Sequence, residues 1–230
     1  MTTDSASQWL EILRKEYLQD FIRGGGSAVK FIMPSKEIAP EDLIGRLKIA
    51  SEEEGFQFAS IDAAHTKIHM IDRLFNDIAR QVDWDGLASN FLGRLIVNNG
   101  CRLQENSKKL KLNEIAALNG LEEKFLIIDI RKWLEKDIYR DYGMSQEFRI
   151  AMRKMCLAQL EEDQDPSFFR DLVKQWLQGQ ISRISLLKEA LIFQKINRCN
   201  ARHILFSLVH WLRRNERSGM VLVLDSFSTV

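Results

Sequence analysis

An aspartate at the end of an apolar run is the residue of this sequence best placed to do chemistry. Asp225 follows the five apolar residues Met220–Leu224, and such a run is typical of a buried parallel strand. The strand would carry the Asp225 carboxylate to the carboxyl edge of a sheet. There the carboxylate could bind a metal ion, although a polar residue that simply ends a buried strand is a common alternative.

A second group of candidate residues lies on the helix predicted over residues 200–217. At helical spacing, one face of this segment is apolar and the opposite face is basic. The apolar face holds Ala201, Ile204, Leu205, Leu208, Val209 and Leu212, and the basic face holds Arg202, His203, His210, Arg213, Arg214 and Arg217. The four arginines could contact nucleic-acid phosphates, or they could form an ordinary solvated face.

His65 and His69 lie four residues apart, which is a spacing that suits a metal site on a helix. The nearby carboxylates are Asp62 and Asp72, and no third ligand is evident. A zinc site normally needs three or four protein ligands. The sequence therefore predicts no metal site at these histidines.

The composition limits the class of protein. The chain has 230 residues, and 33 Lys and Arg against 32 Asp and Glu give a net charge of +1, which excludes a histone-like polycation. Three cysteines, odd in number and far apart, form neither a disulfide framework nor a CxxC zinc motif; Cys156 is expected to be a buried small apolar residue. No signal peptide and no run of ~18 apolar residues appear, so we expect a reduced, cytoplasmic protein without a membrane partner.

The order of predicted elements indicates an α/β chain dominated by helices. Three strand-length apolar runs alternate with helical patterns, which is typical of a parallel sheet with crossover helices. Gly24, Gly25 and Gly26 end the first helix. Strands are predicted over residues 27–33, 56–61 and 220–225, and helices over 9–21, 40–54, 67–82 and 200–217, for a total of about 60% helix, well above the usual third.

Between the second and third strands, residues 84–198 favour helical spacing and read as an insertion of five or six helices, with residues 108–111 as a solvated loop. The predicted organisation therefore has three parts. Residues 1–83 form a helix and half of the α/β core, residues 84–198 form the insertion, and residues 199–230 supply the basic helix and the strand that complete the core.

Two segments carry a resemblance to a known family. The first is Glu16-Tyr17-Leu18 with Gly24–Ile32, and the second runs from Ile196-Asn197-Arg198-Cys199-Asn200-Ala201-Arg202 to Gly219–Asp225. They resemble the ATP-binding proteins of BREX-type phage-defence systems, which are AAA+-like P-loop ATPases related to the origin-recognition class. The resemblance implies a P-loop-like parallel sheet, with residues 27–33 leading into the Walker A loop and Asp225 as the Walker B aspartate.

The sequence departs from this family at both nucleotide motifs. A Walker A loop reads GxxxxGK[S/T], because its backbone N–H groups and lysine bind phosphates. Here the first strand runs into Pro34-Ser35-Lys36 and then Pro40 without a glycine, and only Lys36 offers a cation. Ser226 stands where the family has its catalytic carboxylate. Pro34, Ser35, Lys36, Asp225 and Ser226 would thus form a vestigial nucleotide site.

These departures favour a non-catalytic module that acts as a scaffold or regulatory subunit in bacterial anti-phage defence, with no cofactor. The alternatives are an active ATPase that uses ATP and Mg²⁺, and a DNA-binding component that uses the basic helix.

In the family, the strand after Walker B lies between the Walker A and Walker B strands. This chain stops five residues past Asp225. Either it is an N-terminal piece of a longer protein, or the three strands pair among themselves, or a partner covers the edge of strand 220–225. We expect self-association or a protein partner at that strand.

Overall fold

The computed structural model describes residues 5–33, 39–104, 110–160, 166–181 and 183–226. The chain divides into two compact units. The sheet unit comprises residues 1–82 and 212–230, and the helical unit comprises residues 83–211. Helices hold about 60% of the described residues, and one small parallel sheet accompanies them. The prediction of a helix-dominated α/β chain is therefore confirmed.

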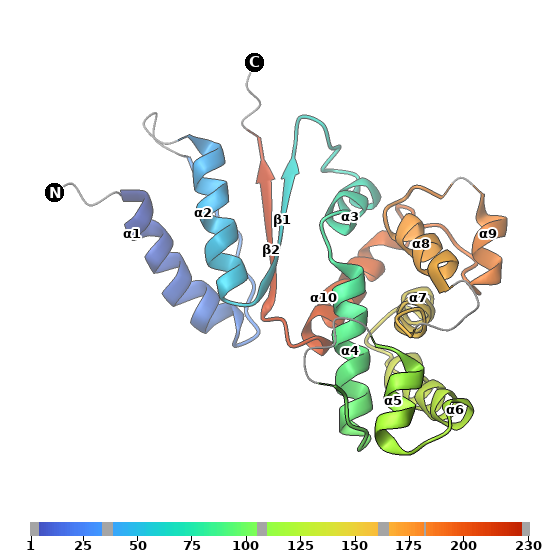
Figure 1. The fold of residues 1–230 in the computed structure, drawn as a ribbon. Helices are drawn as coiled ribbons and strands as arrows, with labels where there is room; N and C mark the ends of the chain where they lie inside the picture. The colour runs from blue at the N-terminus through green and yellow to red at the C-terminus, as the bar shows by residue number, and fades with distance from the viewer. Residues whose placement is uncertain (1–4, 34–38, 105–109, 161–165, 182, 227–230) are drawn as a thin grey trace. The chain divides into compact units, whose positions relative to one another are not determined.

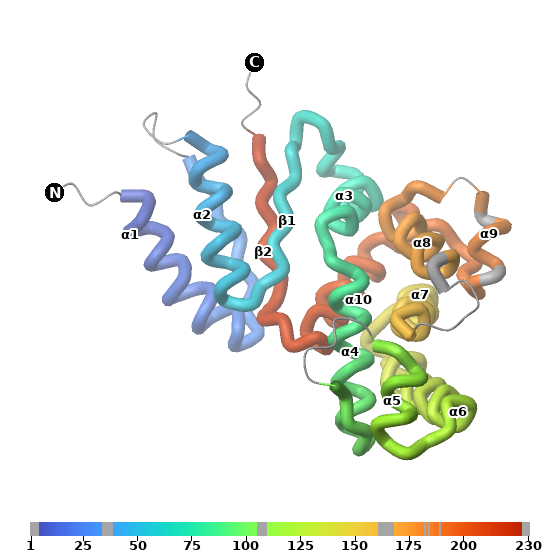
Figure 2. The backbone as a smooth tube through the Cα atoms, in the orientation of Figure 1, coloured from blue at the N-terminus to red at the C-terminus, as the bar shows by residue number. Residues whose placement is uncertain are grey.

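The sheet consists of two parallel strands, β1 (Phe56–Asp62) and β2 (Gly219–Asp225). Phe56 pairs with Gly219 at one end of the ladder, and Asp62 pairs with Asp225 at the other. The strands lie side by side in Figure 1, and their colours in Figure 2 show that distant parts of the chain supply them. The predicted strands over 56–61 and 220–225 are thus confirmed.

The prediction of a third strand over residues 27–33 is wrong. These residues make no strand in the structure. Val29, Phe31 and Met33 are 81%, 99% and 92% exposed. The run has the composition of a strand, but a strand also needs a neighbouring backbone to bond with, and the described residues provide none for this segment.

Four helical segments complete the described part of the sheet unit: α1 (Ser5–Ile12), the π-helical segment η1 (Leu13–Ile22), α2 (Pro40–Glu53) and α3 (Ile71–Ala79). Pro40 occupies the first turn of α2 and Gly55, at φ 78°, follows its end, as proline and glycine commonly do. The helix predicted over 67–82 is shorter, because Lys67–Met70 forms a separate turn in which the Met70 N–H bonds to the Lys67 carbonyl.

The core of the sheet unit lies around β1. Helices α2 and α3 both contact this strand, and its side chains are buried on both faces, with Phe56 and Phe58 on one and Ala59 and Ile61 on the other. Strand β2 is only half-buried, and Leu224 is 47% exposed. The prediction of a fully buried strand is wrong for β2, because α2 and α3 pack against β1 and do not cover β2 in the same way.

The helical unit is built around α7 (Gln146–Leu157), which lies against α4 (Trp84–Asn98), α8 (Pro166–Leu177) and the π-helical turn η2 (Glu135–Tyr139). Aromatic pairs fill its core: Trp84 meets Phe148 edge to face at 6.2 Å between ring centroids, and Phe91 meets Trp211 at 4.7 Å. The elements between residues 84 and 198 are α4 (Trp84–Asn98), α5 (Leu112–Asn119), α6 (Glu123–Leu134), η2 (Glu135–Tyr139), α7 (Gln146–Leu157), α8 (Pro166–Leu177) and α9 (Ile184–Glu189).

Helix α10 (Ala201–Arg214) ends three residues before the predicted boundary. Glu216 adopts the left-handed conformation at φ 59°, and the Arg217 N–H turns back to the Leu212 carbonyl. This hydrogen-bonded turn ends the helix, rather than Ser218 and Gly219 as the sequence predicted. Residues 201–211 of α10 belong to the helical unit, and residues 212–214 belong to the sheet unit.

Candidate functional site

Two aspartates end the two strands of the sheet. Asp62 ends β1 and Asp225 ends β2, and they are paired in the parallel ladder. The Asp225 carbonyl accepts a hydrogen bond of 2.7 Å from the Ala63 N–H, which extends the pairing one residue beyond β1. The structure therefore places Asp225 at the carboxyl edge of a sheet, as the sequence predicted, and adds Asp62 beside it.

The carboxylate of Asp62 is engaged by the turn that follows β1. Its Oδ2 lies 2.5 Å from His65 Nδ1, and its Oδ1 accepts a hydrogen bond of 2.7 Å from the Ala64 N–H. The bond to His65, followed by the bond from Ala64, lowers the pKa of Asp62. His65 therefore bonds to the Asp62 carboxylate rather than forming a metal site with His69. Among the described residues, no cluster of three or more metal-binding side chains occurs.

Ser226 follows Asp225 and is exposed. The other three residues of the predicted nucleotide site, Pro34, Ser35 and Lys36, lie outside the described residues. The structure therefore places the second half of that predicted site and says nothing of the first half.

The arginines of the predicted basic face are divided between the two units. Arg202 is exposed in the helical unit, with its guanidinium 5.5 Å from the ring centroid of Phe206. Arg213 and Arg217 are exposed and Arg214 is half-buried in the sheet unit. Ala201, Ile204, Leu208 and Leu212 on the opposite face are buried, which confirms the predicted apolar face at these positions.

The outer edge of β1 is occupied by a side chain that the sequence analysis did not single out. Gln81 accepts a hydrogen bond of 3.0 Å from the Ser60 N–H and donates one of 2.9 Å to the Ser60 carbonyl. Gln57 donates to the Phe58 carbonyl and to the Gln81 carbonyl. The Gln81 amide thus bonds β1 as a neighbouring strand would.

Within the described ranges, no strand or side chain pairs with the outer edge of β2. Because the Asp225 carbonyl bonds to Ala63, the backbone groups of Asp225, Val223 and Val221 face β1. Those of Met220, Leu222 and Leu224 face away, since backbone groups alternate sides along a strand. No hydrogen bond joins these outward groups to another residue that the structure describes.

A buried carboxylate fixes the approach to β2. Glu54, with a side chain 7% exposed, accepts hydrogen bonds from Gln19 Nε2 at 2.8 Å, Arg14 Nε at 2.6 Å and Arg23 Nη2 at 3.0 Å. The Ser218 hydroxyl donates to the Glu54 carbonyl at 2.7 Å. The bond from Gln19, then that from Arg14, lowers the pKa of Glu54. This cluster joins η1, the end of α2 and the residue before β2.

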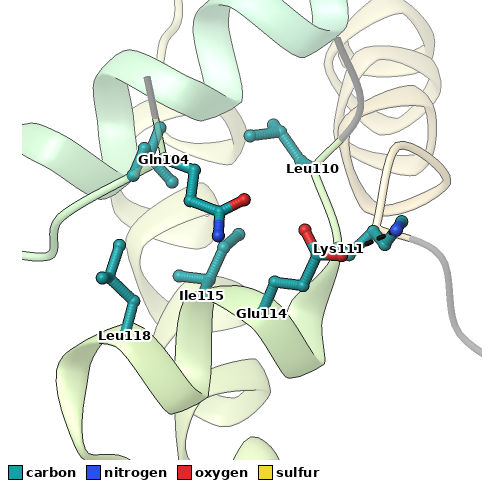
Figure 3. Close-up of a pocket in the computed structure, with 7 residues that line it drawn as sticks. Gln104, Leu110, Lys111, Glu114, Ile115 and Leu118 are labelled. Carbon is teal, nitrogen blue, oxygen red and sulfur yellow. Dashed lines mark hydrogen bonds and ion pairs between the residues drawn. The ribbon is translucent and has the colours of Figure 1, made fainter. Parts of the chain in front are cut away.

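A small pocket lies in the helical unit (Figure 3), with the ion pair of Lys111 and Glu114 on one side. Its volume of about 50 Å³ suits one or two water molecules, whereas ligand pockets usually reach ~300–1,000 Å³. The residues that line the pocket are Leu103, Gln104, Leu110, Lys111, Glu114, Ile115 and Leu118.

The loop prediction over residues 108–111 is wrong for Leu110, which is buried and forms a β-bridge with Leu160.

Comparison with known proteins adds no relative to this geometry. A scan against protein-family models and searches of curated proteins and solved structures found no match to the chain. In the part of the chain that the structure describes, no helix is long and apolar enough to cross a bilayer.

Proposed function

We propose that this chain is a non-catalytic protein-binding module, with a degenerate AAA+-like core, that serves as a scaffold or regulatory subunit in bacterial anti-phage defence. Its binding element is the outer edge of β2. The observation that carries the proposal is the contrast between the two edges of the sheet, since Gln81 occupies the edge of β1 and the edge of β2 is open.

An open strand edge favours protein binding for a physical reason. Unpaired N–H and C=O groups along a strand are a template for pairing with another chain, and an added strand gains both backbone hydrogen bonds and apolar contacts. The side chains of Met220–Val223 are half-buried and Leu224 is nearly half exposed. An added strand would cover apolar surface as well as satisfy the backbone.

The residues at the carboxyl edge support a non-catalytic role. Ser226 cannot act as the general base that a carboxylate provides after a Walker B aspartate, and Asp62 is already bonded to His65 and Ala64. The phosphate segment contains Pro34 and lacks the glycines that let a backbone approach phosphates.

A calorimetric titration with ATP and Mg²⁺ tests the non-catalytic part of the proposal. We expect no heat of binding at micromolar nucleotide and no phosphate release above the rate without protein. Asp225→Ala is the matched variant, since it removes the Walker B carboxylate. Micromolar binding with hydrolysis that Asp225→Ala abolishes would contradict the proposal and favour the ATPase alternative.

DNA binding is the second candidate, and the exposed Arg213 and Arg217 favour it. If these residues contact phosphates, duplex DNA should bind with an affinity that falls steeply with salt. The double variant Arg213→Ala/Arg217→Ala should then reduce the slope of log K against log salt by about 2. Fluorescence anisotropy with a labelled duplex measures the slope, and Lys48→Ala, an exposed cation on α2, is the control. A slope unchanged by the double variant contradicts this role.

A further inference from the structure

We infer that the partner at the β2 edge is a second copy of this chain, whose β2 pairs antiparallel with the first about a two-fold axis at Leu222. The inference rests on the proposed function, because it names the occupant of the same edge. Two copies paired in this way form an isologous dimer, in which each copy contributes the same surface to the interface.

The backbone of β2 is self-complementary in this arrangement. Met220, Leu222 and Leu224 point their N–H and C=O groups away from β1. With the axis at Leu222, each Leu222 faces its own copy, and Met220 faces Leu224 of the second copy. In an antiparallel ladder, residues whose groups face each other exchange two hydrogen bonds. All the outward groups of these three residues therefore find partners.

The charges at the two ends of β2 favour the antiparallel direction. Parallel pairing in register would set Asp225 beside its own copy, with two like charges adjacent. Antiparallel pairing sets Asp225 beside Gly219 of the second copy, with Arg217 two residues beyond. Arg217 lies in the turn just before β2 rather than in the ladder, so its long side chain starts from the same end of the strand as the second copy's Asp225. Arg217 is exposed, so each copy offers its cation to the other's Asp225.

The side chains of β2 also fit a second copy of the strand. Leu224 is 47% exposed and Met220 is half-buried. Both project from the same face of the strand, because side chains alternate. The pairing places Leu224 of each copy beside Met220 of the other, so that the most exposed apolar side chain of β2 gains an apolar neighbour.

Sedimentation of the full chain over a range of concentrations tests the inference through a charge exchange. Arg217→Asp and Asp225→Arg should each weaken the dimer by roughly tenfold, since each sets like charges together at both ends of the interface. The double variant Arg217→Asp/Asp225→Arg should restore most of the affinity. Arg213→Asp, which makes the same charge change elsewhere in the sheet unit, is the control and should leave the dimer unchanged.

Hydrogen exchange on the unmodified chain supplies a test that needs no variant. With rising concentration, the amides of Met220, Leu222 and Leu224 should gain protection, while those of Val221 and Val223 are protected throughout by β1. The inference is wrong if the chain stays monomeric at every concentration. It is also wrong if a dimer forms but its affinity does not respond to the charge exchange and the Leu222 amide gains no protection. The nucleotide titration tests the non-catalytic role separately, and a different protein bound at this edge would leave the proposed function standing.

Discussion

Replacing Trp176 with alanine should lower the free energy of unfolding of the helical unit by about 3–5 kcal/mol. Trp176 on α8 is 1% exposed, and its indole N–H donates a hydrogen bond of 2.9 Å to the Gln194 carbonyl. Alanine would leave a cavity of nearly the whole ring. Folded domains are stable by only about 5–15 kcal/mol, so this change removes a large share of the stability.

Urea denaturation followed by tryptophan fluorescence measures this loss, because four of the five tryptophans lie in the helical unit. Trp176→Phe is the matched control. It keeps an aromatic ring in the core and removes the N–H, and water can reach the exposed Gln194, so it should cost clearly less than alanine. Equal midpoints for the two variants would show that the ring does not hold the core together.

Glu54→Gln should produce the largest loss of stability among single carboxylate changes in the sheet unit. The variant removes a negative charge that three donors share and leaves Arg14 and Arg23 beside a neutral amide. The pKa of Glu54 is lowered in the folded chain, so its stabilising effect is present above the ordinary pKa of a glutamate. That effect is lost as the pH falls through the lowered folded value. The variant should therefore also flatten the acid side of the stability profile.

Hydrogen exchange of peptides from α2 and β1, recorded between neutral and acidic pH, measures both effects within the sheet unit. Glu53→Gln is the matched control, because its side chain is 54% exposed and pairs only with Arg14 among the described ion pairs. The control should change protection little at any pH. If the two variants behave alike, the buried cluster does not stabilise the approach to β2.

Local patterns in the sequence were sufficient to predict the elements that depend on their own residues. Helix α2 has its proline and acidic residues in the first turn and a glycine after its end, and both paired strands are apolar runs that end in aspartate. The buried Cys156 was also predicted, and burial raises the pKa of its thiol. In each case the signal lies within the element itself.

Features that depend on distant residues could not be predicted. Whether residues 27–33 form a strand depends on a neighbouring backbone with which to pair. The residue types of Val29 and Phe31 favour a strand whether or not such a backbone lies nearby. Gln81 looks like any polar residue near the end of a helix, yet its amide bonds Ser60, 21 residues away. Glu54 follows two other acidic residues in Ser51-Glu52-Glu53-Glu54, and only the folded chain distinguishes it from its exposed neighbour Glu53.

The Gln81 amide has a consequence for how large an assembly of this protein can become. A sheet with two available edges can add subunits at both ends and grow into a fibre. Here the side chain of Gln81 bonds the edge of β1 at Ser60, so among the described residues it is β2 that offers an open edge. If two copies pair through β2 as we infer, a Gln81 side chain lies at either end of the combined sheet. Under that inference the described residues leave no further open edge on the combined sheet, so association would end at two subunits rather than lead to polymerisation.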